Sequence, residues 1–137
     1  DRWPGEAHPG LYALDVNDGA LLWSTPTPDI CEGKADCQPG LSAAATSIPG
    51  AIFSGAMDGH LRAYDSATGG VIWDYDTVRD YQTLSGARGF GGSLGGAAGP
   101  VFKDGMMYVN SGYGIYFHMP GNVLLAFTVA DETTAQP

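Results

Sequence analysis

Short apolar runs of about five residues, bounded by turns that contain glycine and aspartate, dominate this chain of 137 residues. Residues 11–15 and 61–65 form such runs before a turn, and residues 20–24 and 70–74 form them after it. Short runs with strand-forming residues and turn signals at both ends are typical of β-hairpins. The pattern therefore predicts an all-β protein built of short antiparallel strands.

One phrase of eleven residues occurs twice, with the pattern Ala-x-Asp-x-x-x-Gly-x-x-x-Trp. Each matched position in the second copy lies 50 residues after its counterpart in the first. Repetition at a period of this size indicates a solenoid, a propeller or a repeat array. The eight matched residues are Ala13, Asp15, Gly19, Trp23, Ala63, Asp65, Gly69 and Trp73.

The residues of the phrase suit a hairpin. Glycine at the end of each turn permits a positive φ, and the aspartate side chain can accept hydrogen bonds from turn amides. The small alanine leaves room for a large neighbour, and the tryptophan supplies one whose N–H requires an acceptor. We expect each copy to form half of a four-stranded antiparallel sheet and these eight residues to be structural docking positions.

The remaining strands predict one complete blade and two partial blades of a β-propeller. Strands at 41–48 and 51–55 complete a blade with the second copy, whereas residues 77–96 are predicted to be a loop. Three further strands follow at 98–103, 106–111 and 123–129, after which Thr128 replaces the aspartate and the phrase ends. The predicted boundaries are a partial blade at 10–25, a complete blade at 41–76, a partial blade at 97–129 and a polar tail at 130–137.

This number of strands cannot close a ring of four-stranded blades, and it leaves unpaired edges. We therefore expect a single propeller domain whose remaining blades lie in a longer parent sequence or in a separate chain. The sequence does not begin with methionine, so we expect either a mature product or a fragment.

The composition argues against nucleic-acid binding and against a membrane-spanning helix. The formal net charge is −9 with 6 Lys+Arg in total, which argues against nucleic-acid binding. No window approaches 18 consecutive apolar residues, so no spanning helix is expected.

Cys31 and Cys37 are the two cysteines, and both lie in a polar, turn-rich loop. Structural zinc sites require a second such pair, and the Cys-x-x-Cys-His pattern of haem attachment does not occur. A disulfide is favoured over a free reduced pair. A disulfide implies an oxidising compartment, so we expect a periplasmic or extracellular protein.

The repeated phrase resembles the tryptophan-docking motif of the quinoprotein dehydrogenases, which are propellers. A closer resemblance, to the C-terminal blades of the polyvinyl alcohol dehydrogenase family, is carried by residues 41–65, by Gly-Gly-Ala-Ala-Gly-Pro-Val at 95–101, and by residues 110–114 and 119–127. It implies an eight-bladed propeller, pyrroloquinoline quinone (PQQ) held by a calcium ion, and cytochrome c as electron acceptor. Haem c would lie only on another segment or a partner.

The resemblance implies cofactor contacts from this segment but supplies no catalytic residue and no metal ligand. Leu41 stands near the position where related enzymes place a cofactor-contacting tryptophan. Gly95 and Gly96 belong to a glycine-rich run that suits a close backbone approach. Arg79 and Arg88 either face the quinone carboxylates or lie in solvated loops. The candidate cofactor-binding residues are Leu41, Ser42, Arg79, Arg88, Gly95 and Gly96.

Two further features leave alternatives open. His118 has no spaced partner and is interpreted as a loop histidine rather than a ligand. The aromatic residues of segment 112–117 either line a substrate entrance or pack beneath their own loop.

Three functional hypotheses follow. In the first, the chain is part of a periplasmic PQQ-dependent dehydrogenase that oxidises secondary alcohols. The second is a propeller without the cofactor that serves as a binding or assembly module, which the absence of the cofactor-contacting tryptophan favours. The third is one subunit of a split propeller that a partner chain completes.

Overall fold

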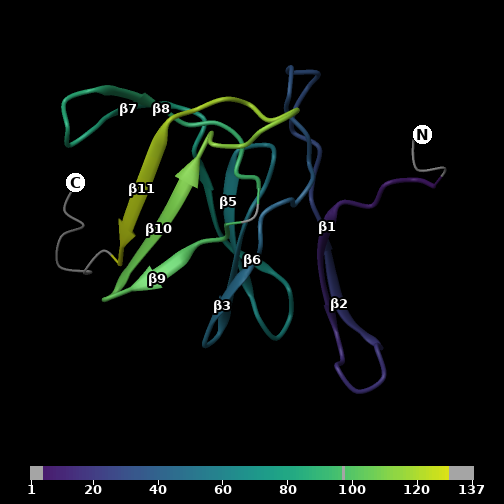
Figure 1. Ribbon diagram of the computed structural model, residues 1–137. Coiled ribbons are helices and arrows are strands. Elements are labelled where there is room, and N and C mark those ends of the chain that lie inside the picture. The colour runs from purple at the N-terminus through teal and green to yellow at the C-terminus, as the bar shows by residue number, and fades with distance from the viewer. Residues whose placement is uncertain (1–4, 97, 130–137) are drawn as a thin grey trace, which may run out of the picture.

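The computed structural model describes residues 5–96 and 98–129, and none of these residues lies in a helix. Their strands form sheets that stand side by side, with the hairpin β1–β2 on one side of a central sheet and β9–β11 on the other (Figure 1). The predicted tail at 130–137 lies outside the described residues. The strands are β1 Gly10–Leu14, β2 Leu21–Pro26, β3 Thr46–Ile48, β4 Ala51–Gly55, β5 His60–Asp65, β6 Val71–Asp76, β7 Asp80–Gln82, β8 Arg88–Phe90, β9 Val101–Lys103, β10 Met106–Ser111 and β11 Val123–Thr128.

The central sheet is the predicted complete blade. Its four strands are antiparallel and follow one another in chain order, β3-β4-β5-β6. The third sheet has the order β11-β10-β9 and is antiparallel as well. Hairpin connections of this kind need only short turns, which agrees with the frequency of glycine in the sequence.

Both copies of the repeated phrase fold in the same way. Ala13 pairs with Trp23 across β1 and β2, and Ala63 pairs with Trp73 across β5 and β6. In each pair of strands the register shifts directly after the alanine. The turn glycines Gly19 and Gly69 have φ of 73° and 75°, which confirms the predicted positive φ at both turns.

The aspartates of the phrase organise these turns. Asp65 accepts hydrogen bonds through Oδ1 from the backbone N–H groups of Ala67 and Thr68 and from the Thr68 hydroxyl. Asp15 accepts equivalent bonds from the backbone N–H and side-chain amide of Asn17. Because these bonds favour the ionised carboxylate, they hold the pKa of Asp65 and the pKa of Asp15 below the ordinary aspartate value.

Three predictions of secondary structure were wrong. The predicted strand at 98–103 is a strand only over Val101–Lys103. The predicted strand at 41–48 is a strand only over Thr46–Ile48, because the preceding residues leave the sheet and the Gly40 carbonyl instead accepts a hydrogen bond from the N–H of Met57. The predicted loop at 77–96 contains the hairpin β7–β8. Its strands have three residues each, which is too short for an alternating pattern to be recognised.

The main hydrophobic core lies between the central and third sheets. Leu61 from β5 and Met107 and Val109 from β10 are buried there together with Leu94 from the glycine-rich run. Aromatic rings from both sheets pack around them, and Phe53 meets Phe102 edge-on at 5.0 Å between ring centroids. The two blades are therefore joined by apolar packing.

Trp23 makes the contact between the first hairpin and the central sheet. Its Nε1 donates to the carbonyl oxygen of Ser66 at 3.2 Å, and its ring lies against Gly69, where an added Cβ would be 2.4 Å from the indole. Thr25 adds a hydrogen bond of 2.6 Å to the Gly69 carbonyl. The indole of one copy of the phrase thus packs on the turn of the next copy.

A buried set of hydroxyl groups joins the glycine-rich run to the central and third sheets. Thr77 Oγ1 donates to the Gly59 carbonyl at 2.7 Å and lies 2.8 Å from Ser111 Oγ. Ser93 Oγ donates to the Met57 carbonyl and accepts from the N–H of Met119. These bonds satisfy polar groups that would otherwise be buried without partners.

Cys31 and Cys37 form the predicted disulfide, with Cα atoms 5.5 Å apart. It closes a short ring in the loop between β2 and β3. The predicted oxidised pair is therefore confirmed.

Replacement of Trp23 tests the contact between the blades. We expect Trp23→Phe to lower the free energy of unfolding by about 1–2 kcal/mol, because the hydrogen bond to Ser66 and part of the ring contact with Gly69 are lost. Trp23→Ala should cost about 2–3 kcal/mol, since the whole half-buried ring is removed. Urea unfolding of the longer parent protein measures both values. Leu22→Ala is the control, because Leu22 is exposed, and an equal loss in that variant would contradict the prediction.

The aspartate turns predict an acid-sensitive contribution to stability. A carboxylate whose pKa is lower in the folded protein stabilises the fold above its unfolded pKa of about 3.9 and loses that contribution as pH falls through the folded value. We therefore expect Asp65→Asn to lose less stability than the wild-type protein on acidification from pH ~5 to ~3. Denaturant unfolding of the longer parent protein at each pH gives the comparison. Asp104→Asn, at an exposed turn position, should retain the wild-type slope.

Candidate functional site

The segment that leads into β3 carries two of the candidate cofactor-binding residues. Leu41 is half-buried, whereas Ser42 is exposed. The Ser42 hydroxyl accepts a hydrogen bond from the N–H of Gly96 at 3.4 Å. Gly95 lies against the same hydroxyl, because an added Cβ at Gly95 would be 2.7 Å from Ser42 Oγ. The structure thus brings Ser42 together with Gly95 and Gly96, which lie 53 and 54 positions after it in the sequence.

His118 joins this group. Its Nε2 lies 3.3 Å from Ser42 Oγ, and its Nδ1 contacts the carbonyl oxygen of Tyr116. The interpretation of His118 as an isolated loop histidine missed this partner. No sequence signal was available, because the two residues are 76 positions apart and belong to no common motif.

The aromatic loop that precedes His118 consists of residues 112–117. The side chains of Tyr113, Tyr116 and Phe117 are 60%, 80% and 73% exposed. These exposures exclude the alternative in which the aromatic residues pack beneath their own loop. The loop instead presents an apolar surface beside His118.

The arginines do not join the Ser42 cluster. Arg79 donates from Nε to the carbonyl of Asp76, and its guanidinium lies over the Tyr75 ring at 4.6 Å from the centroid. Arg88 pairs with Asp80 at 2.9 Å, and both side chains are mostly exposed. Both guanidinium groups are therefore engaged within or next to the hairpin β7–β8.

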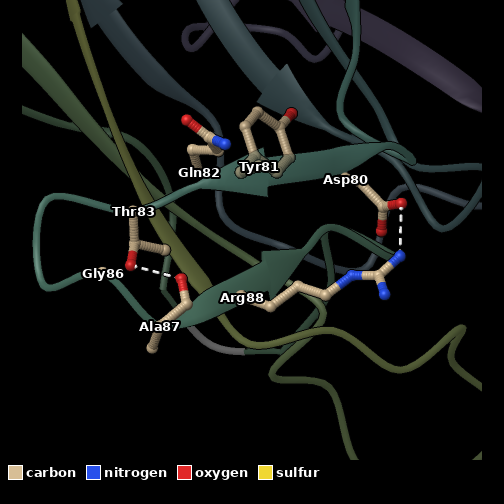
Figure 2. A pocket seen from close by; sticks show the side chains of 7 residues that line it. All are labelled: Asp80, Tyr81, Gln82, Thr83, Gly86, Ala87 and Arg88. Atoms are coloured by element: carbon tan, nitrogen blue, oxygen red, sulfur yellow. Dashed lines mark hydrogen bonds and ion pairs between the residues drawn. The ribbon is translucent and has the colours of Figure 1, made fainter.

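The hairpin β7–β8 encloses a concavity of about 540 Å³, lined mainly by polar residues (Figure 2). Figure 2 shows Arg88 extended along the hairpin toward Asp80, while Tyr81 and Gln82 project from the neighbouring strand. Burial raises the pKa of Tyr81, and its interaction with Tyr75 raises it further. Because its charged groups pair with each other in solvent, this concavity presents no free charge to a ligand.

A second cavity, of about 760 Å³, lies between the central sheet and the third sheet and is mostly apolar. Trp73 lines it and packs edge-on against Phe127 at 5.6 Å between centroids. Its stacked neighbour Tyr75 contacts the same phenyl ring. The cavity lies next to the third sheet, which has three strands in the described part of the chain.

A charged network around the buried Arg62 lies on the face of the central sheet opposite the main core. Arg62 is 3% exposed, and it pairs with Asp58 at 2.8 Å and with Asp74 at 3.0 Å. Burial alone lowers the pKa of Arg62, but the ion pair with Asp58 outweighs it and the pKa lies above its ordinary value. Asp74 also contacts His60 Nδ1 at 2.6 Å. This network connects β5 to β6 and to the preceding turn.

Within residues 5–96 and 98–129, no three acidic, histidine or cysteine side chains gather to form a metal site. In the same part of the chain no helix is long and apolar enough to cross a membrane.

A complete four-stranded antiparallel blade, flanked by sheets that pack on it through a repeated phrase, defines a β-propeller repeat protein. The chain belongs to the PQQ_2 family, described as "Outer membrane protein assembly factor BamB", whose model matches residues 7–135. The predicted propeller class is thereby confirmed.

Curated relatives are similar over most of the chain. It is 42% identical over 132 residues to a polyvinylalcohol dehydrogenase of Pseudomonas sp., which covers 88% of this chain and 20% of that relative. It is 43% identical over 134 residues to the polyvinylalcohol dehydrogenase of Sphingopyxis sp. strain 113P3, with the same coverage. The chain therefore spans about a fifth of the length of these relatives.

Solved structures agree on the fold. BamB from Moraxella catarrhalis matches with a TM-score of 0.55 and 21% identity over 88% of this chain and 28% of that chain. Quinohemoprotein alcohol dehydrogenase ADHIIG from Pseudomonas putida HK5 matches with a TM-score of 0.54 and 28% identity over 75% of this chain and 14% of that chain.

Proposed function

We propose that the chain forms C-terminal blades of a periplasmic PQQ-dependent alcohol dehydrogenase similar to the polyvinylalcohol dehydrogenases. The observation that carries this proposal is the identity of 42–43% over 88% of the chain. Further relatives are described as quinone- or cytochrome c-linked alcohol dehydrogenases. The reaction is the oxidation of a secondary alcohol, with electrons passed to cytochrome c.

The contribution of this chain to the cofactor site is limited. PQQ, when bound, accepts hydride from the alcohol, and its carboxylates require donors. The exposed Ser42 hydroxyl is the donor that this segment offers, and Gly96, whose N–H contacts that hydroxyl, lies beside it. Calcium ligands and the catalytic base belong to other blades in this proposal, since the described residues gather no metal-binding cluster.

A scaffold or assembly module without PQQ is the second candidate. Leu41 in place of the cofactor-contacting tryptophan supports it, as does the engagement of Arg79 and Arg88 in local contacts. In either case the remaining blades, whether in the same parent chain or in another subunit, complete the ring.

If further blades complete the ring, the isolated segment should be unstable or prone to aggregation. The outer strands expose large apolar side chains, among them Leu22, Ile72 and Leu124, and the apolar cavity beside Trp73 remains open. We expect residues 1–137 expressed alone to aggregate or to unfold without a cooperative transition. Size-exclusion chromatography and thermal unfolding test this expectation. A monodisperse monomer with a sharp transition would show that no further blades are needed.

Reconstitution decides between enzyme and scaffold. The parent protein, incubated with PQQ and Ca²⁺, should acquire quinone absorbance and reduce an artificial dye only when a secondary alcohol is present. Arg79→Ala and Arg88→Ala should weaken PQQ binding about fivefold or less, because exposed ion pairs contribute about 1 kcal/mol at most. Absence of bound quinone and of alcohol-dependent turnover would favour the scaffold.

A further inference from the structure

His118 occupies a slot that two glycines create. An added Cβ at Gly95 would lie 2.2 Å from His118 Nε2, and one at Gly114 would lie 2.5 Å from His118 Cγ. Any larger residue at either position would displace the ring. Two separate segments of the chain therefore leave space for this one imidazole.

The backbone before His118 is strained. Tyr116 and Phe117 both adopt the left-handed conformation, with φ of 61° and 53°, which is unfavourable for residues other than glycine because the Cβ crowds the backbone. Through this turn the carbonyl oxygen of Tyr116 faces His118 Nδ1. Strain of this kind persists only where the surrounding contacts maintain it.

This contact determines the tautomer of the neutral imidazole. A carbonyl oxygen only accepts hydrogen bonds, so Nδ1 carries the proton and the lone pair of Nε2 faces Ser42 Oγ at 3.3 Å. The Ser42 hydroxyl consequently donates to Nε2. A nucleophile, a base and a group that orients the base are in contact, which is the arrangement of covalent catalysis at serine.

We propose that Ser42 and His118 form a reactive serine site that hydrolyses esters with an apolar acyl group. The site shares Ser42 and Gly96 with the proposed PQQ contacts, but the hydrolysis itself requires no cofactor. Ser42 is exposed, and the N–H of Gly96 lies beside its hydroxyl as a backbone donor. The neighbouring Tyr116 and Phe117 side chains offer the apolar surface for the acyl chain.

The reaction proceeds in two balanced steps. Ser42 Oγ attacks the ester carbonyl carbon while His118 Nε2 takes the hydroxyl proton, and the same proton passes to the leaving alcohol as the ester bond breaks. Water then attacks the acyl-serine, again through His118, and releases the carboxylic acid and free Ser42. The separation of 3.3 Å is within the range in which such contacts tighten once substrate is bound.

An alkyl fluorophosphonate tests the nucleophile on the parent protein. The probe should label Ser42, identified by peptide mass spectrometry, with fluoride as the leaving group. Ser42→Ala should abolish that label, whereas Ser47→Ala, which removes another exposed serine five residues further along, should leave it unchanged. Labelling of Ser42 no faster than that of Ser47 would overturn the proposal.

The base is tested separately. His118→Gln retains an acceptor for the Ser42 hydroxyl but removes the base, so labelling should fall by ~100-fold. In His118→Ala the glycine-lined slot is empty, and free imidazole should restore labelling in part. A purely structural histidine would show neither effect. Unfolding curves for each variant establish that the protein remains folded.

Turnover completes the test. The wild-type protein without added PQQ should hydrolyse p-nitrophenyl butyrate, and Ser42→Ala should remove that activity. Label on Ser42 without ester turnover would overturn the assigned reaction. Because alcohol oxidation is assayed by dye reduction with PQQ and Ca²⁺, failure of either activity is distinguishable from failure of the other.

Discussion

The packing of Trp23 on the turn of the next repeat is the interaction on which the arrangement of the blades depends. A propeller blade has no hydrogen bonds to its neighbour along the strands, so the blades must be held by side chains. The indole fills the space above Gly69 and donates to the Ser66 carbonyl. One residue thereby fixes both the separation of the two sheets and the position of the turn.

That interaction explains why the phrase is repeated as a unit. The tryptophan of one copy needs a glycine in the next copy, because a Cβ at Gly69 would overlap the indole. The glycine in turn needs the aspartate, whose carboxylate holds the turn amides in place. Trp73 has a different environment, since it lies among Phe53, Tyr75 and Phe127 at the edge of an apolar cavity. The third sheet lacks a complete copy of the phrase, because Thr128 stands at the position of the aspartate.

The repetition of the phrase decided much of what could be predicted about the fold from the sequence. Strands within the repeat were found because each copy supports the other, and β4 and β10 were found because apolar runs mark them. The segment 41–45 was assigned to a strand in error, because its small residues suit a sheet although the backbone turns away to meet Met57. The hairpin β7–β8 was missed, because three-residue strands with polar residues give no periodic signal.

The candidate site was predictable only in its parts. Glycines that permit a close approach were recognised at Gly95 and Gly96, but what approaches Gly95 is the ring of His118, from a loop with no counterpart in the repeat. The pairing of Ser42 with His118 is a property of tertiary structure alone, because three loops must converge to produce it. The residues that hold the first hairpin to the central sheet belong to the repeated phrase, whereas most of those between the central and third sheets do not. The cluster of Ser42, Gly95 and His118 lies where the repeat is interrupted, and an interruption of this kind is where chemistry specific to one protein is best sought.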